Sequence, residues 1–121
     1  MVGKLSSGLD TVTQSTAATT SSLSAASISV SSSGNNTLVS GSSGKTIRVF
    51  KLFLVFSAAV NATFQDGAST SLSGAIPFST NGSIVLDLDT LPWFVTSAGN
   101  GFVLNLSSSA SVNGTVYYVQ S

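Results

Sequence analysis

Residues 41–56 read GSSGKTIRVFKLFLVF, and this stretch decides the fold class. Its second half is rich in β-branched and aromatic residues, which favour strands over helices. The chain as a whole contains no Glu, and Lys is scarce, so strong helix formers are missing. Residues 46–57 therefore predict one long β-strand.

This predicted strand is apolar on both faces. Because side chains alternate along a strand, its residues divide into two sets. One set is Ile47, Val49, Lys51, Phe53 and Val55, and the other is Arg48, Phe50, Leu52, Leu54 and Phe56. A strand that is half exposed has one polar face, so this one needs two covers.

We expect one face to pack in the domain's own core and the other to meet a sister subunit. The predicted subunit interface consists of Arg48, Phe50, Leu52, Leu54, Phe56 and Trp93. The alternative is that a loop of the same chain, such as LPWFV at 91–95, folds over the second face.

The first half, GSSGKT, resembles the end of a phosphate-binding loop. The complete motif needs a glycine five positions before Gly44, where this chain has Val39. It also needs a helix after the lysine, because a helix N-terminus holds the phosphates. A strand follows instead, so GSSG is interpreted as a turn.

The rest of the chain predicts further short strands separated by Gly, Asn and Ser turns. Strands are expected near residues 27–30, 37–40, 60–65, 69–76, 83–89, 102–106 and 112–120. The expected fold is all-β, an antiparallel jelly-roll-like sandwich of about eight strands over residues 34–121. Residues 1–33 are nearly half Ser or Thr and lack aromatics, which predicts an extended N-terminal arm.

Composition argues against several classes of function. Four basic and four acidic residues give zero net charge, so no basic surface for nucleic acid is expected. No apolar run approaches the ~20 residues that span a bilayer, so no membrane partner is expected. Cys and His are absent, which removes the usual nucleophile, general base and metal ligands. We expect no enzyme activity and no cofactor.

Two smaller features leave alternatives open. Asp87 and Asp89 share a face of a predicted strand, and they suit a calcium ligand pair, a glycosidase pair or a solvated strand end. Trp93 suits a sugar-stacking platform, or a core or interface anchor.

Residues 27–120 carry a series of turn and strand signatures. They include GNNTLV, GKTIRV, VNATFQDG, SGAIPF, a WF pair before TSAGNG, and VNGTVYYV. In these the chain resembles small all-β proteins encoded by tailed bacteriophages, namely capsid decoration (cement) proteins or the terminal domains of head and tail fibres.

The resemblance implies a structural protein on the virion surface. A cement protein would form a homotrimer, bind the major capsid protein and stabilise the shell, with the arm contacting capsid subunits. The expected arm contacts are Leu5, Leu9, Val12 and Leu23. The alternative is a fibre adhesin with an aromatic glycan pocket around Trp93, Tyr117 and Tyr118.

Overall fold

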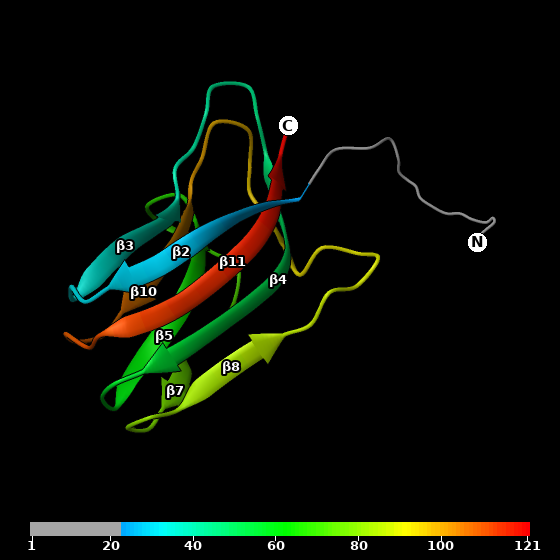
Figure 1. Ribbon diagram of the computed structural model, residues 1–121. Coiled ribbons are helices and arrows are strands. Elements are labelled where there is room, and N and C mark those ends of the chain that lie inside the picture. Colours follow the sequence, from blue (N-terminus) through cyan, green and yellow to red (C-terminus); the bar gives the residue numbers. More distant parts are fainter. Residues whose placement is uncertain (1–22) are drawn as a thin grey trace.

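The computed structural model describes residues 23–121, which form two antiparallel sheets of five strands each (Figure 1). The strands are β2 (Ser24–Val30), β3 (Gly34–Val39), β4 (Ile47–Phe56), β5 (Val60–Asp66), β6 (Thr70–Ser71), β7 (Ile76–Phe78), β8 (Ser83–Leu86), β9 (Phe94–Val95), β10 (Phe102–Leu106) and β11 (Val112–Gln120). No helix occurs among these residues. The predicted all-β class and antiparallel sandwich are confirmed.

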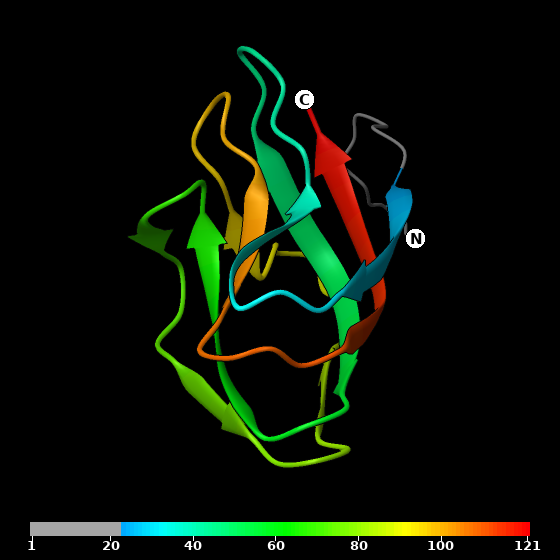
Figure 2. The same ribbon diagram turned by 90° about the vertical axis from the view of Figure 1, so that its left-hand side faces the viewer.

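Each sheet combines strands from both ends of the described chain. The β5 sheet has the order β3-β10-β5-β6, with β7 also pairing with β5. The β4 sheet has the order β2-β11-β4-β8, with β9 also pairing with β4. Figure 2 shows the two layers edge-on, with long loops at the end where the C-terminus lies. The finer jelly-roll name stays a prediction.

A β-bulge in β4 changes the expected division of its side chains. Lys51 pairs with Tyr117 of β11 and Val49 pairs with Tyr118, so Phe50 has no partner in β11. An extra residue in one strand reverses the alternation beyond it. The inward set is therefore Ile47, Val49, Leu52, Leu54 and Phe56, each 0% exposed.

The predicted two-face division of the strand is thus wrong, because it assumed an uninterrupted period of two. The bulge brings apolar residues from both predicted sets into one core. The core between the sheets is centred on stacked aromatic rings. Phe64 packs against Phe94 and Phe102 with ring centroids 4.8 and 5.6 Å apart, and Phe56 stacks on Phe78 at 3.9 Å.

The first described strand, β2, is part of the sandwich. It pairs with β11 over seven residues, from Ser24 opposite Tyr118 to Val30 opposite Val112. Its Ile28 is 4% exposed and belongs to the core. The sandwich therefore includes residues 24–30, which lie before the boundary that we expected at residue 33. Residues 1–22 of the predicted arm lie outside the described residues.

Candidate functional site

Large exposed hydrophobic side chains are concentrated on three strands of the β4 sheet and on the loop between β8 and β9. Of the eight that the described residues contain, all but Leu23 come from β4, β8, β9 or the loop 87–93. We call these seven the outer apolar face: Phe53, Val55, Val85, Leu88, Leu91, Trp93 and Val95. Single exposed hydrophobics are ordinary, whereas a group this large on so small a domain indicates an interaction surface.

The strand part of the outer apolar face is a direct consequence of the bulge. Beyond Phe50 the outward hydrophobic residues of β4 are Phe53 and Val55, which are 40% and 45% exposed. Phe53 lies opposite Val85 of β8, which is 61% exposed. Directly opposed side chains on one face of a sheet pack together, so these residues form a continuous apolar surface.

The loop part is held in place by Trp93. Its indole Nε1 donates a hydrogen bond to the carbonyl oxygen of Asp87 at 2.7 Å, which joins the two ends of the loop 87–93. Its backbone N–H donates to the carbonyl oxygen of Val49 at 2.7 Å. The ring is nevertheless 46% exposed. Both hydrogen bonds of Trp93 therefore fix the end of the loop that carries the exposed hydrophobic residues.

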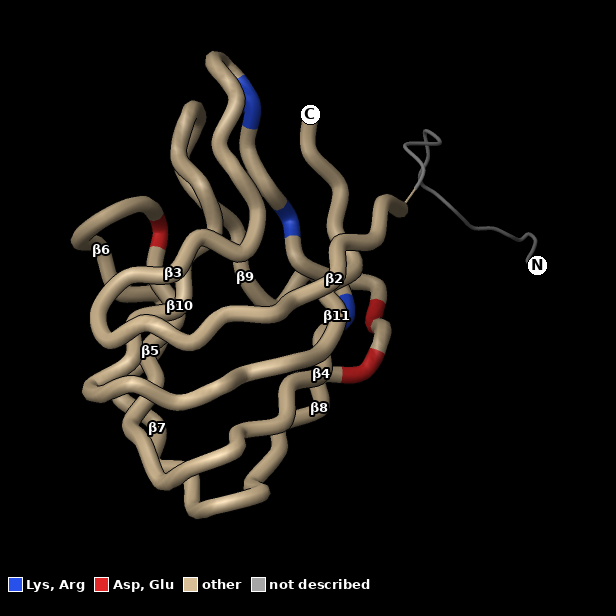
Figure 3. Tube along the Cα trace, turned by 60° about the vertical axis from the view of Figure 1, so that its left-hand side comes forward, with Lys and Arg blue, Asp and Glu red and all other residues tan. Residues whose placement is uncertain are grey.

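Charges of both signs border the outer apolar face. Arg48 and Lys51 lie on β4, and Asp87 and Asp89 lie in the loop, while the rest of the described chain carries few charges (Figure 3). Arg48 Nη1 donates to Ser121 Oγ at 2.9 Å, and Lys51 Nζ lies 5.6 Å from the centre of the Tyr117 ring. A surface with both signs of charge around an apolar centre suits a partner of the same kind.

The residues predicted as a subunit interface have different environments. Leu52, Leu54 and Phe56 are fully buried within the chain, so they present no surface to a second subunit and that prediction is corrected. Arg48 and Phe50 are half-buried, and Trp93 is exposed.

The sequence reasoning missed Phe53, Val55 and Val85 as outward residues. The alternation of SIVL, residues 83–86, was the available signal for Val85, since Ile84 and Leu86 pack against the core. No local signal marked the bulge that turns Phe53 outward.

The segment LPWFV does not cover the second face of β4 as the alternative expected. Its last two residues form β9, which pairs with Arg48 and Val49 of β4 and so extends the sheet. Phe94 points into the core, whereas Leu91 and Val95 are 75% and 44% exposed. The segment adds to the exposed apolar surface.

The predicted capsid contacts divide in a similar way. Leu23 is described and is 46% exposed. Leu5, Leu9 and Val12 lie outside the described residues.

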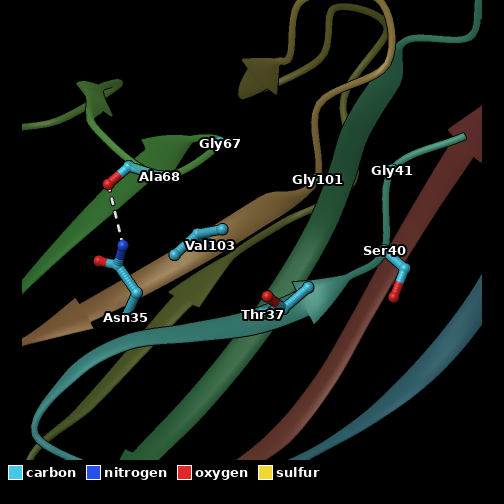
Figure 4. A pocket seen from close by; sticks show the side chains of 8 residues that line it. All are labelled: Asn35, Thr37, Ser40, Gly41, Gly67, Ala68, Gly101 and Val103. Carbon is cyan, nitrogen blue, oxygen red and sulfur yellow. Dashed lines mark hydrogen bonds between the residues drawn. The ribbon is translucent and has the colours of Figure 1, made fainter. Parts of the chain in front are cut away.

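A shallow depression of about 340 Å³ lies on the β5 sheet, at the loop end of β3 and β10 (Figure 4). It is lined by Asn35, Thr37, Ser40, Gly41, Gly67, Ala68, Gly101 and Val103. Asn35 Nδ2 crosses it to donate to the Ala68 carbonyl at 2.9 Å. A Cβ on Gly101 would lie 2.8 Å from the Val39 carbonyl oxygen, so close loop packing requires that glycine. No charged or aromatic side chain lines the depression.

Near the depression, Asp66 fixes the loop between β9 and β10. Asp66 is 6% exposed, and its carboxylate accepts hydrogen bonds from Ser97 N at 3.0 Å, Ser97 Oγ at 2.7 Å and Asn100 Nδ2 at 3.0 Å. Burial alone would raise the pKa of Asp66, but the hydrogen bonds from Ser97 and Asn100 outweigh it and hold the pKa below 3.8. This is a structural clamp.

The acidic pair named from the sequence lies in the loop after β8. Asp87 and Asp89 are exposed, and Asp89 accepts a hydrogen bond from the backbone N–H of Thr90 at 2.7 Å. Residues 23–121 contain no group of three or more potential metal-ligating side chains. Within that range no helix is long and apolar enough to cross a membrane.

No protein-family model matches the chain, and no curated protein is significantly similar to it.

Proposed function

We propose that this chain is a structural virion protein, a capsid decoration (cement) protein that forms a homotrimer on a bacteriophage head. The outer apolar face carries the proposal. Seven large hydrophobic side chains are exposed around β4, β8 and β9 in a chain with 7% charged residues. Typical soluble domains have about 25% charged residues, so this surface is suited to burial against other protein.

The proposed mechanism is mechanical. Burial of the outer apolar face between three copies excludes apolar surface from water, at roughly 25 cal/mol per Å². Leu52 of β4 pairs with Leu86 of β8, so Lys51 and Asp87 come next along the two strands and lie side by side. Each copy therefore brings both signs of charge to its neighbour in a cyclic contact. Three copies of the N-terminal segment, residues 1–22, contact the major capsid protein, and this multivalency raises the avidity for the shell.

The trimer is tested by placing a charge on the outer apolar face. Phe53→Lys and Val85→Lys put ammonium groups at exposed positions, so the fold is retained while the subunit contact loses several-fold or more in affinity. Asn61→Lys adds the same charge on the exposed outer side of β5 and serves as the control.

Sedimentation equilibrium should give at least three times the chain mass of 12.2 kDa for the wild type and Asn61→Lys, and a smaller mass for the other two variants. A monomeric wild type, or a trimer unaffected by Phe53→Lys, would refute the proposed contact.

The capsid role is tested by deletion of residues 1–22, which ends before β2 and removes none of the described strands. We expect the truncated trimer to remain folded and to lose binding to capsids of the encoding phage. Equal decoration by the truncated and full chains would contradict the role of the N-terminal segment. Cryo-EM of the virion then counts the copies, since many trimers over the head support a cement protein and a few at one vertex support a fibre or tail component.

The exposed, anchored ring of Trp93 favours one second candidate, a fibre adhesin that binds a host glycan. The three aromatics expected for its pocket do not converge. Tyr118 packs against the core, whereas Tyr117 lies under Lys51 on the outer side. Glycan-array binding that is lost in Trp93→Ala would support this candidate over the cement protein.

A further inference from the structure

β2 is an open edge of the β4 sheet. Among residues 23–121 its only strand partner is β11, so the backbone groups on its other side have no strand to pair with. Its seven residues, SAASISV, pair with β11 without a register shift and include no charged residue, Pro or Gly. Such a regular, uncharged edge is a template for an added strand.

The other edge strands of the sandwich each have a feature that discourages strand addition. β6, β8 and β9 are two to four residues long. β7 contains Pro77, which lacks an N–H donor. β3 begins at Gly34, which has a positive φ of 86°, and its pairing with β10 shifts register. β2 is therefore the one long, regular edge in the described part of the chain.

The sequence of β2 fits a second copy of itself. An antiparallel pair centred on Ser27 uses all seven residues and places Ala26 of one strand opposite Ile28 of the other. The inward residues then meet inward residues, and the exposed Ala25 meets the exposed Ser29. A two-fold contact always brings like residues together, so the lack of charge on β2 removes the repulsion that would otherwise oppose it.

We propose that β2 pairs with β2 of a second copy across a two-fold axis at Ser27, which joins two β4 sheets into one continuous sheet. The occupant of this edge is thus a second copy of the chain, bound by backbone hydrogen bonds. The outer apolar face lies over β4, β8 and β9, separated from β2 by β11. The two contacts use different surfaces, so a two-fold contact can link trimers without disturbing them.

The proposal is tested by disulfide trapping in the full chain, which has no native Cys. Residues directly opposed in an antiparallel pair have Cα atoms about 4.5–5.5 Å apart, within the roughly 4.4–6.8 Å that a disulfide spans. Ser27→Cys should therefore form linked pairs under mild oxidation.

Ser29→Cys is the matched control, because Ser29 is equally classed as exposed on the same strand. In the proposed pair, Ser29 of one chain lies opposite Ala25 of the other. The two Ser29 residues are therefore four positions apart, about 14 Å along the strands. We expect at least tenfold more linked chain for Ser27→Cys on a non-reducing gel. Equal linking of the two variants would overturn the proposal.

A second measurement separates this contact from the proposed trimer. In a Phe53→Lys background the β2 pair should persist, with twice the chain mass of 12.2 kDa at high protein concentration. Adding Ser27→Lys places two ammonium groups at the axis and should yield monomer. The β2 contact is refuted if the Phe53→Lys variant is already monomeric and Ser27→Cys forms no disulfide-linked pairs in that background. The same result would not contradict the proposed trimer.

Discussion

The bulge at Phe50 makes a sharp prediction about deletions in β4. Without Phe50, the neighbours Val49 and Lys51 become consecutive, as their partners Tyr118 and Tyr117 in β11 already are. Every inward side chain then stays inward. The loop 87–93, which joins the two strands that pair on either side of the bulge, absorbs the lost residue. Deletion of Phe50 should therefore leave a folded domain.

Deletion of Phe53 removes the same residue type from the same strand with the opposite consequence. It reverses the inward and outward alternation of side chains within a regular stretch of the strand. Either Leu54 and Phe56 must then turn outward, or the inward residues before position 53 must turn outward. Both side chains are 0% exposed in the native chain. Exposure of two such side chains, at about 1.5–3 kcal/mol each, costs roughly 3–6 kcal/mol. That is a large fraction of the 5–15 kcal/mol typical of a domain.

The loss for the Phe50 deletion is expected to be about 1–2 kcal/mol, because only a half-buried side chain is removed. Urea unfolding followed by circular dichroism measures both free energies. The Phe50 deletion should show a cooperative transition with a slightly lower midpoint, and the Phe53 deletion a transition at much lower urea or none. Equal stability of the two variants would refute the bulge as the origin of the β4 side-chain pattern.

Other substitutions test packing and charge in the sandwich. Gly114→Ala would drive its Cβ into the carbonyl oxygen of Phe53 on the neighbouring strand, so it should cost more than about 3 kcal/mol; Gly74→Ala, which meets open space, should leave the thermal midpoint nearly unchanged. Asp66→Asn leaves buried donors of Ser97 poorly matched and should cost about 1–3 kcal/mol by urea unfolding. Because the pKa of Asp66 is lowered in the folded state, its contribution to the free energy of unfolding is present above pH 3.8 and is lost as the pH falls through the folded pKa. The wild type should therefore lose this stability on acidification, whereas Asp66→Asn should not. An identical dependence of stability on acid pH in the two proteins would disprove the clamp.

Local sequence determined the class of structure in this protein. The strand-forming composition of residues 47–56 and the turns at Gly67 and Asn81 are local properties, since β-branched residues favour strands and positive φ favours Gly or Asn. The alternation in residues 27–30 also indicated a strand there. The boundary expected at residue 33 reflected composition, which cannot show that a Ser-rich strand is paired with β11.

The candidate site was decided by tertiary structure. When a strand is apolar throughout, each of its faces is either buried in the domain or available for binding. The sequence does not show which residues share a face when the strand contains a bulge. The bulge exists only relative to β11, a partner more than fifty residues away in the chain, where Tyr117 and Tyr118 pair on either side of Phe50. That long-range pairing turned Leu52 inward and Phe53 outward, and with them it set where this domain can meet another subunit.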